Sequence, residues 1–246
     1  MKWDSKLYNN SQNFVSEYGK SLLEFVPAGT DKILDLGCGT GTLTNQLADR
    51  CNYVLGIDSS DTMIHEAKNC FPHLDFATVD ALEIDYTCEW DIIFSNAVFH
   101  WIDNHNLLLQ KIYKALKPSG KLICEFGAHG NISTIENGFR YALQEMGIQY
   151  VSKFNFPTVS SFEQLLAKNG FLIEQIYSYD RPTPLKDGDQ GLYNWAIQFF
   201  QSELGQFTPE QQYNVLSTMS SKIKSSLWNG TCWVADYKRL RVIAAK

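Results

Sequence analysis

The segment Ile33–Gly41 reads ILDLGCGTG, and it decides how the rest of this 246-residue sequence is interpreted. Its first four residues are typical of a short buried strand, and the glycine-rich half is typical of a tight turn into a helix over residues 42–48. Because glycine has no side chain and adopts dihedral angles that other residues resist, a ligand can approach the backbone of such a turn closely. The segment therefore predicts a ligand-binding strand–turn–helix unit.

A second predicted strand, residues 53–57, ends in Asp58 one strand–helix–strand step further on. A carboxylate at that strand end can accept hydrogen bonds from the two hydroxyls of a ribose. Together with the glycine turn it predicts half of a nucleoside-binding site. The alternatives are that the glycines only form a turn and that Asp58 only caps the following helix.

The spacing of the glycines distinguishes two kinds of nucleotide cofactor. A dinucleotide-binding turn needs the pattern G-x-G-x-x-G, in which the pyrophosphate lies on the helix N-terminus. Here Thr42 occupies the position of the third glycine, and the actual third glycine comes early, at Gly41. The pattern G-x-G-x-G preceded by Asp35 suits a nucleoside with an amino-acid tail, whose ammonium Asp35 would face. An oxidoreductase that binds NAD is therefore the less favoured alternative.

Four segments resemble, in order and spacing, the class I S-adenosylmethionine-dependent methyltransferases; they are residues 33–41, 56–60, 91–101 and 116–122. Trp3, Asp4, Tyr8 and the later segments look most like the trans-aconitate methyltransferase group. The resemblance implies S-adenosyl-L-methionine as cofactor and S-adenosyl-L-homocysteine as product. It also implies an α/β fold, with a doubly wound, seven-stranded, mostly parallel sheet and a helical cap.

The resemblance further implies which residues hold the cofactor. The set comprises Tyr8, Tyr18, Asp35, Gly37, Cys38, Gly39, Gly41, Asp58, Ser59, Met63, Asp80, Ala81, Asn96 and Ala97. Besides the glycines and Asp58, three of these have a structural alternative: Asp80 as a turn residue, Met63 as a core residue, and Cys38 as merely a small side chain.

The acceptor side of the site is predicted after the fourth strand, where His100 is a candidate general base or a residue that only orients its neighbours. Candidate substrate contacts are Trp101, His129, Arg140, Arg181 and Trp195. The guanidinium fork of an arginine matches a carboxylate, although surface salt bridges are the commoner role of arginines. His65, His73 and His105 are expected at the surface.

Length and composition predict a single domain, and the resemblance implies that it is one methyltransferase domain over residues 1–246. Residues 1–30 would form N-terminal lid helices, residues 31–127 the cofactor-binding half, and two inserts at 131–147 and 191–228 a cap over the acceptor. The six cysteines include no C-x-x-C pair, so neither a metal site nor a disulfide framework is expected. The net charge of −6 disfavours nucleic acid as a partner. The absence of a long apolar run or a signal peptide predicts a cytoplasmic protein without a membrane partner.

The predicted strands cover residues 31–36, 52–57, 73–78, 90–95, 120–126, 171–179 and 232–245. The predicted helices cover residues 14–26, 41–49, 61–69, 104–116 and 160–169, besides those in the two inserts. The predicted function is methyl transfer to a small molecule, with O-methylation of a carboxylate such as a trans-aconitate-like acid as the leading choice. Alternatives are N-, C- or acyl-carrier-bound carboxyl methylation and a catalytically silent S-adenosylmethionine-binding module. The oligomeric state is left open.

Overall fold

The computed structural model describes residue 19 and residues 21–246. The chain divides into two compact units. The first unit contains the chain up to Ala128 together with Phe154–Ser178 and Leu240–Lys246. The second unit contains His129–Lys153 and Tyr179–Arg239, and so it includes both predicted inserts.

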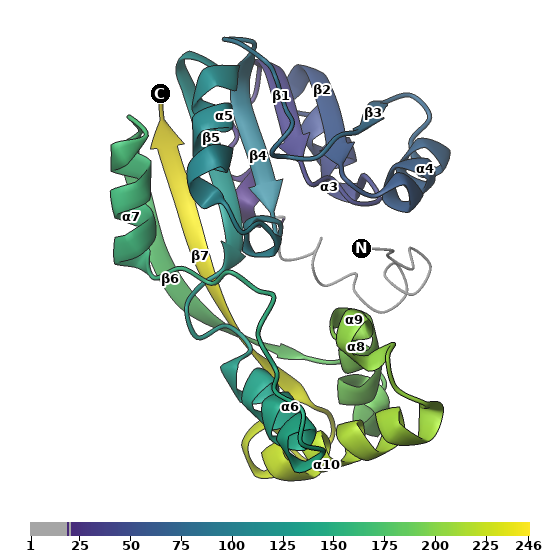
Figure 1. Ribbon diagram of the computed structural model, residues 1–246. Helices are drawn as coiled ribbons and strands as arrows, with labels where there is room; N and C mark the ends of the chain where they lie inside the picture. Colours follow the sequence, from purple (N-terminus) through teal and green to yellow (C-terminus); the bar gives the residue numbers. More distant parts are fainter. Residues whose placement is uncertain (1–18, 20) are drawn as a thin grey trace. The chain divides into compact units, whose positions relative to one another are not determined.

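A seven-stranded sheet is built from β1 (Thr30–Leu36), β2 (Cys51–Asp58), β3 (Asp75–Thr78), β4 (Trp90–Asn96), β5 (Leu116–Gly127), β6 (Leu172–Pro184) and β7 (Val234–Ala245). The strand order is β3-β2-β1-β4-β5-β7-β6, and the four pairs from β3 to β5 are parallel. Strand β7 points in the opposite direction to β4 (Figure 1). Lys246, which follows β7, exchanges backbone hydrogen bonds with Ser119 and Gly120 near the start of its neighbour β5. The prediction of a mostly parallel sheet is thus confirmed, with β7 as an antiparallel strand.

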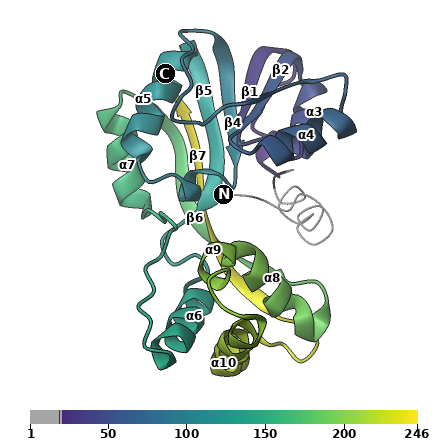
Figure 2. The same cartoon turned by 45° about the vertical axis from the view of Figure 1, so that its right-hand side comes forward.

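Alternate residues of the central strands face opposite sides of the sheet. Leu34, Leu36 and Ile93 pack in one buried cluster with residues of α5 (His105–Ala115) and α7 (Val159–Lys168). Ile33, Ile92 and Phe94 pack in another, with Leu22, Leu23 and residues of α3 (Thr42–Ala48). Figure 2 shows α5 beside β5, and α5 in turn contacts α7. Both faces of the sheet are therefore covered by helices, which confirms the doubly wound fold.

The second unit consists mainly of helices, namely α6 (Ser133–Glu145), α8 (Gly191–Phe199), α9 (Gln201–Leu204) and α10 (Pro209–Leu227), with a short 3₁₀ turn η2 (Gly188–Gln190). Helix α10 begins with a capping box in which Thr208 and Gln211 satisfy each other's backbone amides. Helices α6 and α10 lie side by side (Figures 1 and 2). Phe139 stacks on Phe200 at 4.1 Å between ring centroids, which makes an aromatic core for this unit.

Most predicted elements agree with the structure, and the differences have local causes. Helix α5 ends at Ala115 because Leu116 already pairs with Trp90 of β4, ahead of a register shift in that ladder. Strand β6 extends to Pro184 rather than residue 179. Of the predicted helix 14–26, residues 19 and 21–23 are helical and residues 14–18 lie outside the described residues.

Candidate functional site

The glycine turn joins β1 to α3 and is fastened to the end of β2. The backbone amides of Gly37 and Cys38 donate to the carbonyl oxygen of Ile57 at 2.7 and 2.9 Å. Gly37, Gly39 and Gly41 all have positive φ angles, of 78°, 55° and 82°. A Cβ atom on Gly37 would lie 2.1 Å from Val98 and one on Gly41 2.7 Å from a Phe76 ring atom, whereas one on Gly39 would meet nothing within 4 Å. The first and last glycines are therefore required by packing, and the backbone at Gly39 faces open space.

Asp58 connects this turn to the following helix α4 (Asp61–Cys70). Its Oδ2 accepts the Gly39 amide at 3.1 Å and its Oδ1 accepts the Ser60 amide at 2.9 Å. Burial raises the pKa of this carboxyl, and the two backbone hydrogen bonds oppose the shift. The N-cap side chain of α4 is Ser60, which accepts the Met63 amide, so Asp58 is not the helix cap. Each Asp58 oxygen has one further lone pair for a ligand. Ser59, which lies between Asp58 and Ser60 in the sequence, is exposed.

Asp35 is buried below the turn, with 2% of its surface exposed. The Thr44 hydroxyl donates to its Oδ2 at 2.6 Å. Burial raises the pKa of Asp35 to about 7; the charge of Asp58 adds to the shift, and the Thr44 hydrogen bond opposes it. The neighbouring thiol of Cys38 is also buried, and burial together with the charges of Asp35 and Asp58 raises its pKa well above the ordinary value. Cys38 is therefore a neutral thiol, which agrees with its choice for size.

The remaining predicted cofactor residues differ in exposure. Met63 is a buried side chain of α4. Asp80 is exposed and its Oδ1 accepts the Leu82 amide at 2.8 Å, as a turn aspartate does. Ala81 is half-buried and packs against the core cluster around α5. Tyr8 and Tyr18 lie outside the described residues.

The chain changes direction sharply after β4. Asn96 ends the strand, and Ala97 has a φ of 62°, a left-handed conformation that is uncommon for a residue with a Cβ atom. Its amide donates to the carbonyl oxygen of Glu125 at 2.7 Å, which holds this conformation in place. The turn leads into a single 3₁₀ turn, η1 (Phe99–Trp101). Strained backbone of this kind occurs often at functional sites.

His100 lies in η1 and is buried, with 7% exposed. The Gly127 amide donates to its Nδ1 at 3.3 Å. Because a backbone amide can only donate, Nδ1 carries no proton and a neutral ring has its hydrogen on Nε2. Three aromatic rings lie near the imidazole: Trp101 at 5.4 Å, Phe156 at 5.7 Å and Phe154 at 6.4 Å between centroids. In this arrangement His100 offers a hydrogen-bond donor rather than a free basic nitrogen.

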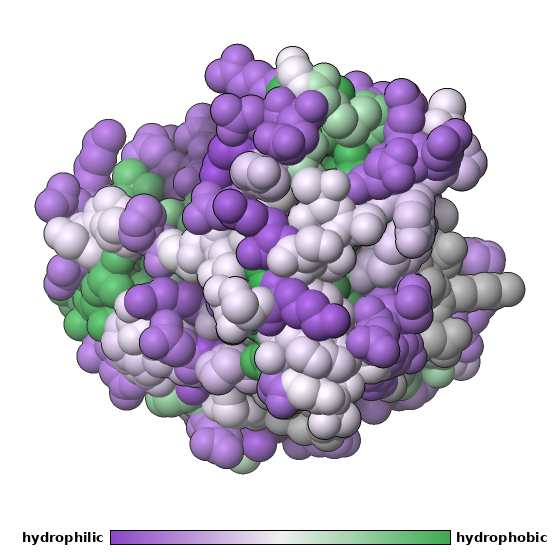
Figure 3. All heavy atoms as spheres, turned by 90° about the horizontal axis from the view of Figure 1, so that it is seen from below, coloured by the Kyte–Doolittle hydropathy of each residue, from purple (hydrophilic) through white to green (hydrophobic). Residues whose placement is uncertain are grey.

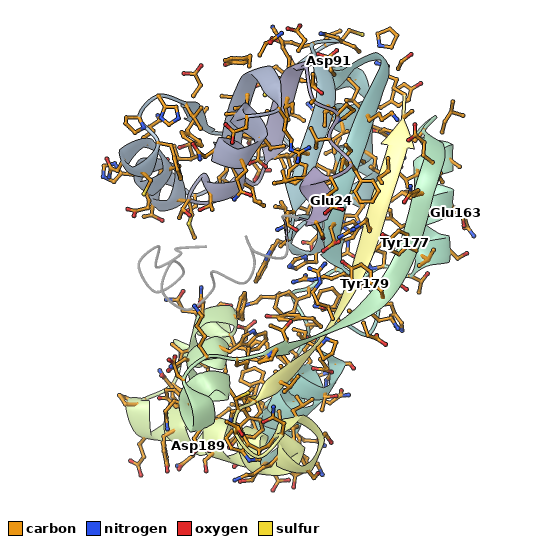
Figure 4. All side chains as sticks on the ribbon, turned by 180° about the vertical axis from the view of Figure 1, so that it is seen from behind. Glu24, Asp91, Glu163, Tyr177, Tyr179 and Asp189 are labelled. Carbon is orange, nitrogen blue, oxygen red and sulfur yellow. The ribbon has the colours of Figure 1, made fainter. Side chains whose placement is uncertain are left out.

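The other predicted substrate contacts belong to the second unit. Arg140 is exposed, donates to Asn137 at 2.6 Å and lies 5.6 Å from the ring centroid of Tyr150. Arg181 donates to the hydroxyl of Tyr179, which Figure 4 labels on β6 beside Tyr177. Trp195 is 2% exposed and its indole donates to the Tyr237 hydroxyl at 2.6 Å, so the structure gives it a packing role. His129 is exposed. A substrate contact for Trp101, Trp195, the two arginines and His129 stays a prediction.

Two residues near η1 were missed by the sequence reasoning. His105 was expected at the surface, but it is buried, and its Nε2 lies 2.8 Å from the Phe99 carbonyl oxygen. Asn155 contacts the same turn. Asp91, labelled in Figure 4, lies near the other end of β4, where it pairs with Lys117 away from His105 and Asn155.

The described residues contain neither a metal-binding cluster nor a membrane-spanning helix. In that part of the chain, no group of three His, Cys, Asp or Glu side chains is arranged to hold a metal ion. No helix there is long and apolar enough to cross a membrane. On the face shown in Figure 3, hydrophobic residues lie in small patches between hydrophilic ones.

Comparison with known proteins identifies the class. Residues 34–124 match the family model of a methyltransferase domain. Over 261 aligned residues the chain is 30% identical to the uncharacterized methyltransferase C70.08c of Schizosaccharomyces pombe, and the alignment covers 99% of this chain and 98% of that protein. The chain therefore belongs to the methyltransferase family. It is an S-adenosylmethionine-dependent methyltransferase, as the glycine turn and the three accompanying segments indicated.

Two further similarities are partial. The trans-aconitate 2-methyltransferase of Deinococcus radiodurans is 33% identical over 133 residues, which cover 52% of this chain and 51% of that protein. The chain thus matches about half the length of that enzyme. The structure of Haemonchus contortus phosphoethanolamine N-methyltransferase 2, solved with phosphomonomethylethanolamine and S-adenosylhomocysteine, has the same fold at a TM-score of 0.57 and 22% identity. That match covers 94% of this chain and 52% of the other.

Proposed function

We propose that the chain transfers the methyl group of S-adenosylmethionine to a carboxylate oxygen of a small organic acid. The observation that carries the proposal is the hydrogen bond from the Gly127 amide to His100 Nδ1. It occupies Nδ1 of His100 as an acceptor, so this nitrogen does not serve as a base, and the site suits an acceptor that is already an anion. The partial similarity to trans-aconitate 2-methyltransferases points to the same acceptor class.

The first unit offers features that fit each part of the cofactor. The open space at Gly39 would let the cofactor approach the backbone closely. The remaining lone pairs of the Asp58 carboxylate would accept hydrogen bonds from the ribose hydroxyls. Asp35, buried with a raised pKa, would be stabilised as a carboxylate by an ammonium group. Asn96 and Ala97 would contact the methionine part, and Asp80 and Ala81 the adenine. The bound cofactor supplies a methyl group on a sulfonium, whose thioether is a good leaving group.

The protein then has to position the acceptor rather than activate it. A carboxylate oxygen attacks the methyl carbon as the carbon–sulfur bond breaks, and the bonding electrons pass to sulfur. Well-oriented proximity of two reactants supplies about 7–11 kcal/mol of a barrier. His100 would help to orient the acceptor, with the neighbouring aromatic rings excluding water.

A second candidate is methyl transfer to an amine. The rings of Trp101, Phe154 and Phe156 around His100 favour it, since aromatic faces attract cations such as ammonium groups. An amine acceptor must lose a proton before or during transfer, so this reaction requires a base. His100 would then have to act as that general base.

The test is a methyl-transfer screen with di- and tricarboxylic acids, free fatty acids, phenols and small amines, with S-adenosylhomocysteine formation as the signal. We expect turnover with an acid. His100→Ala should keep a substantial fraction of that turnover, because a carboxylate acceptor needs no general base. If His100 were a general base, its loss would cost about 10²–10⁴-fold. His65→Ala, on the exposed side of α4, is the control. Turnover confined to phenols or amines, with His100→Ala inactive, would overturn the carboxylate proposal. Binding of S-adenosylhomocysteine without turnover on any class would favour the silent module.

A further inference from the structure

A single asparagine holds the segment that carries His100. The amide of Asn155 donates to the carbonyl oxygen of His100 at 2.9 Å. Its side-chain Nδ2 lies 3.1 Å from the carbonyl oxygens of both Ile102 and Asp103. All of these residues belong to the first unit. Asn155 therefore spans the whole of the turn that follows the strained Ala97.

His105 completes this set of contacts. Its Nε2 lies 2.8 Å from the carbonyl oxygen of Phe99, and because a carbonyl only accepts, this nitrogen carries the hydrogen. The other ring nitrogen, Nδ1, is then an acceptor and lies 3.4 Å from Asn155 Nδ2, whose two hydrogens are shared between this nitrogen and the Ile102 and Asp103 carbonyl oxygens. The contacts run from Phe99 through His105 and Asn155 back to His100, so they close a ring around the turn.

The ring of contacts needs a neutral His105. Burial lowers the pKa of His105, which the Phe99 hydrogen bond and the charge of Asp103 partly oppose. The imidazole packs against the rings of Phe99, Phe126 and Phe162, and Asp103 is the one charged group among the causes of its shift. A proton on Nδ1 would point at the Asn155 amide group and break that contact.

Asn155 also places two aromatic side chains beside His100. Its neighbours Phe154 and Phe156 stack on each other at 5.3 Å between centroids, and both lie near the His100 ring. Trp101 meets Phe154 edge-on at 4.8 Å. Because the backbone on either side of Asn155 carries both rings, the hydrogen bonds of this one residue fix their position.

We propose that Asn155 and His105 form a clasp, defined by these two residues, that positions His100 and its aromatic neighbours for methyl transfer. Both are positioning residues, since they act through His100. The inference rests on the proposed function only in that His100 faces the acceptor; it does not depend on whether the acceptor is an acid or an amine.

The first experiment needs no acceptor. Imidazole nitrogen shifts are followed by ¹⁵N NMR against pH in the S-adenosylhomocysteine-loaded protein, for wild type, Asn155→Ala and Asn155→Asp. In wild type, we expect His100 and His105 to hold single Nε2–H tautomers, and His105 to titrate below the ordinary pKa of a histidine. Asn155→Ala keeps the backbone hydrogen bond to the His100 carbonyl oxygen but loses the side-chain contacts to Ile102, Asp103 and His105. The turn should then loosen and weaken the Gly127 hydrogen bond to His100 Nδ1, so His100 should become a mixture of tautomers. In Asn155→Asp, the new carboxylate next to Nδ1 should raise the pKa of His105 by at least one unit.

The second experiment follows activity on the acceptor panel described above. Asn155→Ala should lower kcat about tenfold or more with little change in the KM for S-adenosylmethionine, because the cofactor residues are untouched. In Asn155→Asp, the acid limb of the kcat profile should move to higher pH together with the His105 titration. If no panel member is turned over, the acceptor proposal fails while the NMR result still decides the clasp.

Asn169→Ala is the matched control. Asn169 also donates two side-chain hydrogen bonds, one to Asn106 in α5, the helix that begins at His105, and one to the Leu165 carbonyl oxygen. It should leave the His100 tautomer and the kcat profile unchanged. The clasp is disproved if Asn155→Ala binds S-adenosylhomocysteine normally and leaves the His100 and His105 shifts as in wild type. It is equally disproved if Asn169→Ala produces the same changes. If Asn155→Ala does not fold, the Asn155→Asp titration carries the test.

Discussion

The glycine turn of the first unit and the helices of the second unit differ in how closely their structure depends on particular residues. At the turn, backbone geometry makes the contacts, and each glycine is required by a positive φ angle or by a near neighbour. In the second unit, apolar side chains such as Phe139 and Phe200 make the contacts, and many other side chains of similar volume would do so too. A site built from backbone leaves a readable pattern in the sequence, whereas one built from packed side chains does not.

The same difference applies to charge. In the first unit Asp35 is buried and Asp58 is half-buried, and burial raises the pKa of both carboxyls, so a cationic or hydroxyl-bearing ligand changes their energy considerably. The arginines predicted to hold the acceptor, Arg140 and Arg181, each have a polar neighbour within the second unit. Substitutions in the two regions should therefore have separable effects on cofactor affinity and on stability.

The largest effect is expected for Gly37→Ala. The new Cβ atom would lie 2.1 Å from Val98 and the residue would keep a φ of 78°. Overpacking and left-handed backbone strain together cost roughly 2–5 kcal/mol. Chemical denaturation should show this loss in the free energy of unfolding, together with loss of cofactor binding.

Gly39→Ala is the matched control for that prediction. Its Cβ atom would meet nothing within 4 Å, so only the backbone strain, about 1–2 kcal/mol, should appear in stability. S-adenosylhomocysteine affinity should nevertheless fall at least tenfold, because the methyl group would occupy the open space next to the turn. An unchanged S-adenosylhomocysteine affinity in Gly39→Ala would show that this glycine is not kept for a ligand.

This contrast explains what could be predicted from the sequence. The strands and the cofactor half followed from the glycine turn, Asp58 and the alternation of apolar residues, because these have fixed geometric consequences. His105 and Asn155 could not be found, since neither belongs to a periodic pattern and they are 50 residues apart in the chain. Trp195 was assigned to the substrate because it stands in an aromatic insert, but its indole donates to Tyr237 in the core of that unit. Burial of a lone aromatic residue depends on tertiary packing.

The second prediction concerns pH. Asp35 has a pKa of about 7 in the folded protein against an ordinary value of 3.8, so the folded state retains a proton that the unfolded state loses. The free energy of unfolding should then fall by roughly 4 kcal/mol in total as pH rises from about 4 to about 7. Asp35→Asn keeps an acceptor for the Thr44 hydroxyl and should abolish this dependence.

Cofactor binding sharpens the same point. Asp35 is about half protonated at pH 7, and an ammonium beside it would lower its pKa, so binding at pH 7 should release roughly half a proton and affinity should rise with pH. Calorimetry in buffers of different ionisation enthalpy measures that release directly. Proton release of the same size in Asp35→Asn would assign it to another group.

The third prediction is that Asp58→Asn weakens cofactor binding more than folding. An amide can replace one backbone hydrogen bond of the carboxylate but its NH₂ group would face the other, and the ribose hydroxyls would lose a charged acceptor. Such unpaired polar groups cost about 1–3 kcal/mol, or roughly 5–150-fold in affinity. Asp80→Ala is the comparison: its carboxylate is exposed and accepts only the Leu82 amide among the described contacts, so a loss below tenfold is expected. A larger loss for Asp80 than for Asp58 would reverse the assignment of the two carboxylates.

The smallest effect is expected in the second unit, for Gly138→Ala. Gly138 lies in α6 where a Cβ atom would approach Ile223 of α10 to 2.6 Å and Met219 to 3.2 Å, so these flexible side chains would have to move. Overpacking of about 1–3 kcal/mol is offset by about 1 kcal/mol of helix propensity, which leaves a net loss of roughly 0–2 kcal/mol. S-adenosylhomocysteine affinity should not change, because every described candidate cofactor residue belongs to the first unit. Asn137→Ala, on the exposed side of the same helix, controls for helix propensity without the close contact. A loss of cofactor affinity in Gly138→Ala but not in Asn137→Ala would show that packing of α6 on α10 affects the cofactor site, and the two regions would then not be energetically separate.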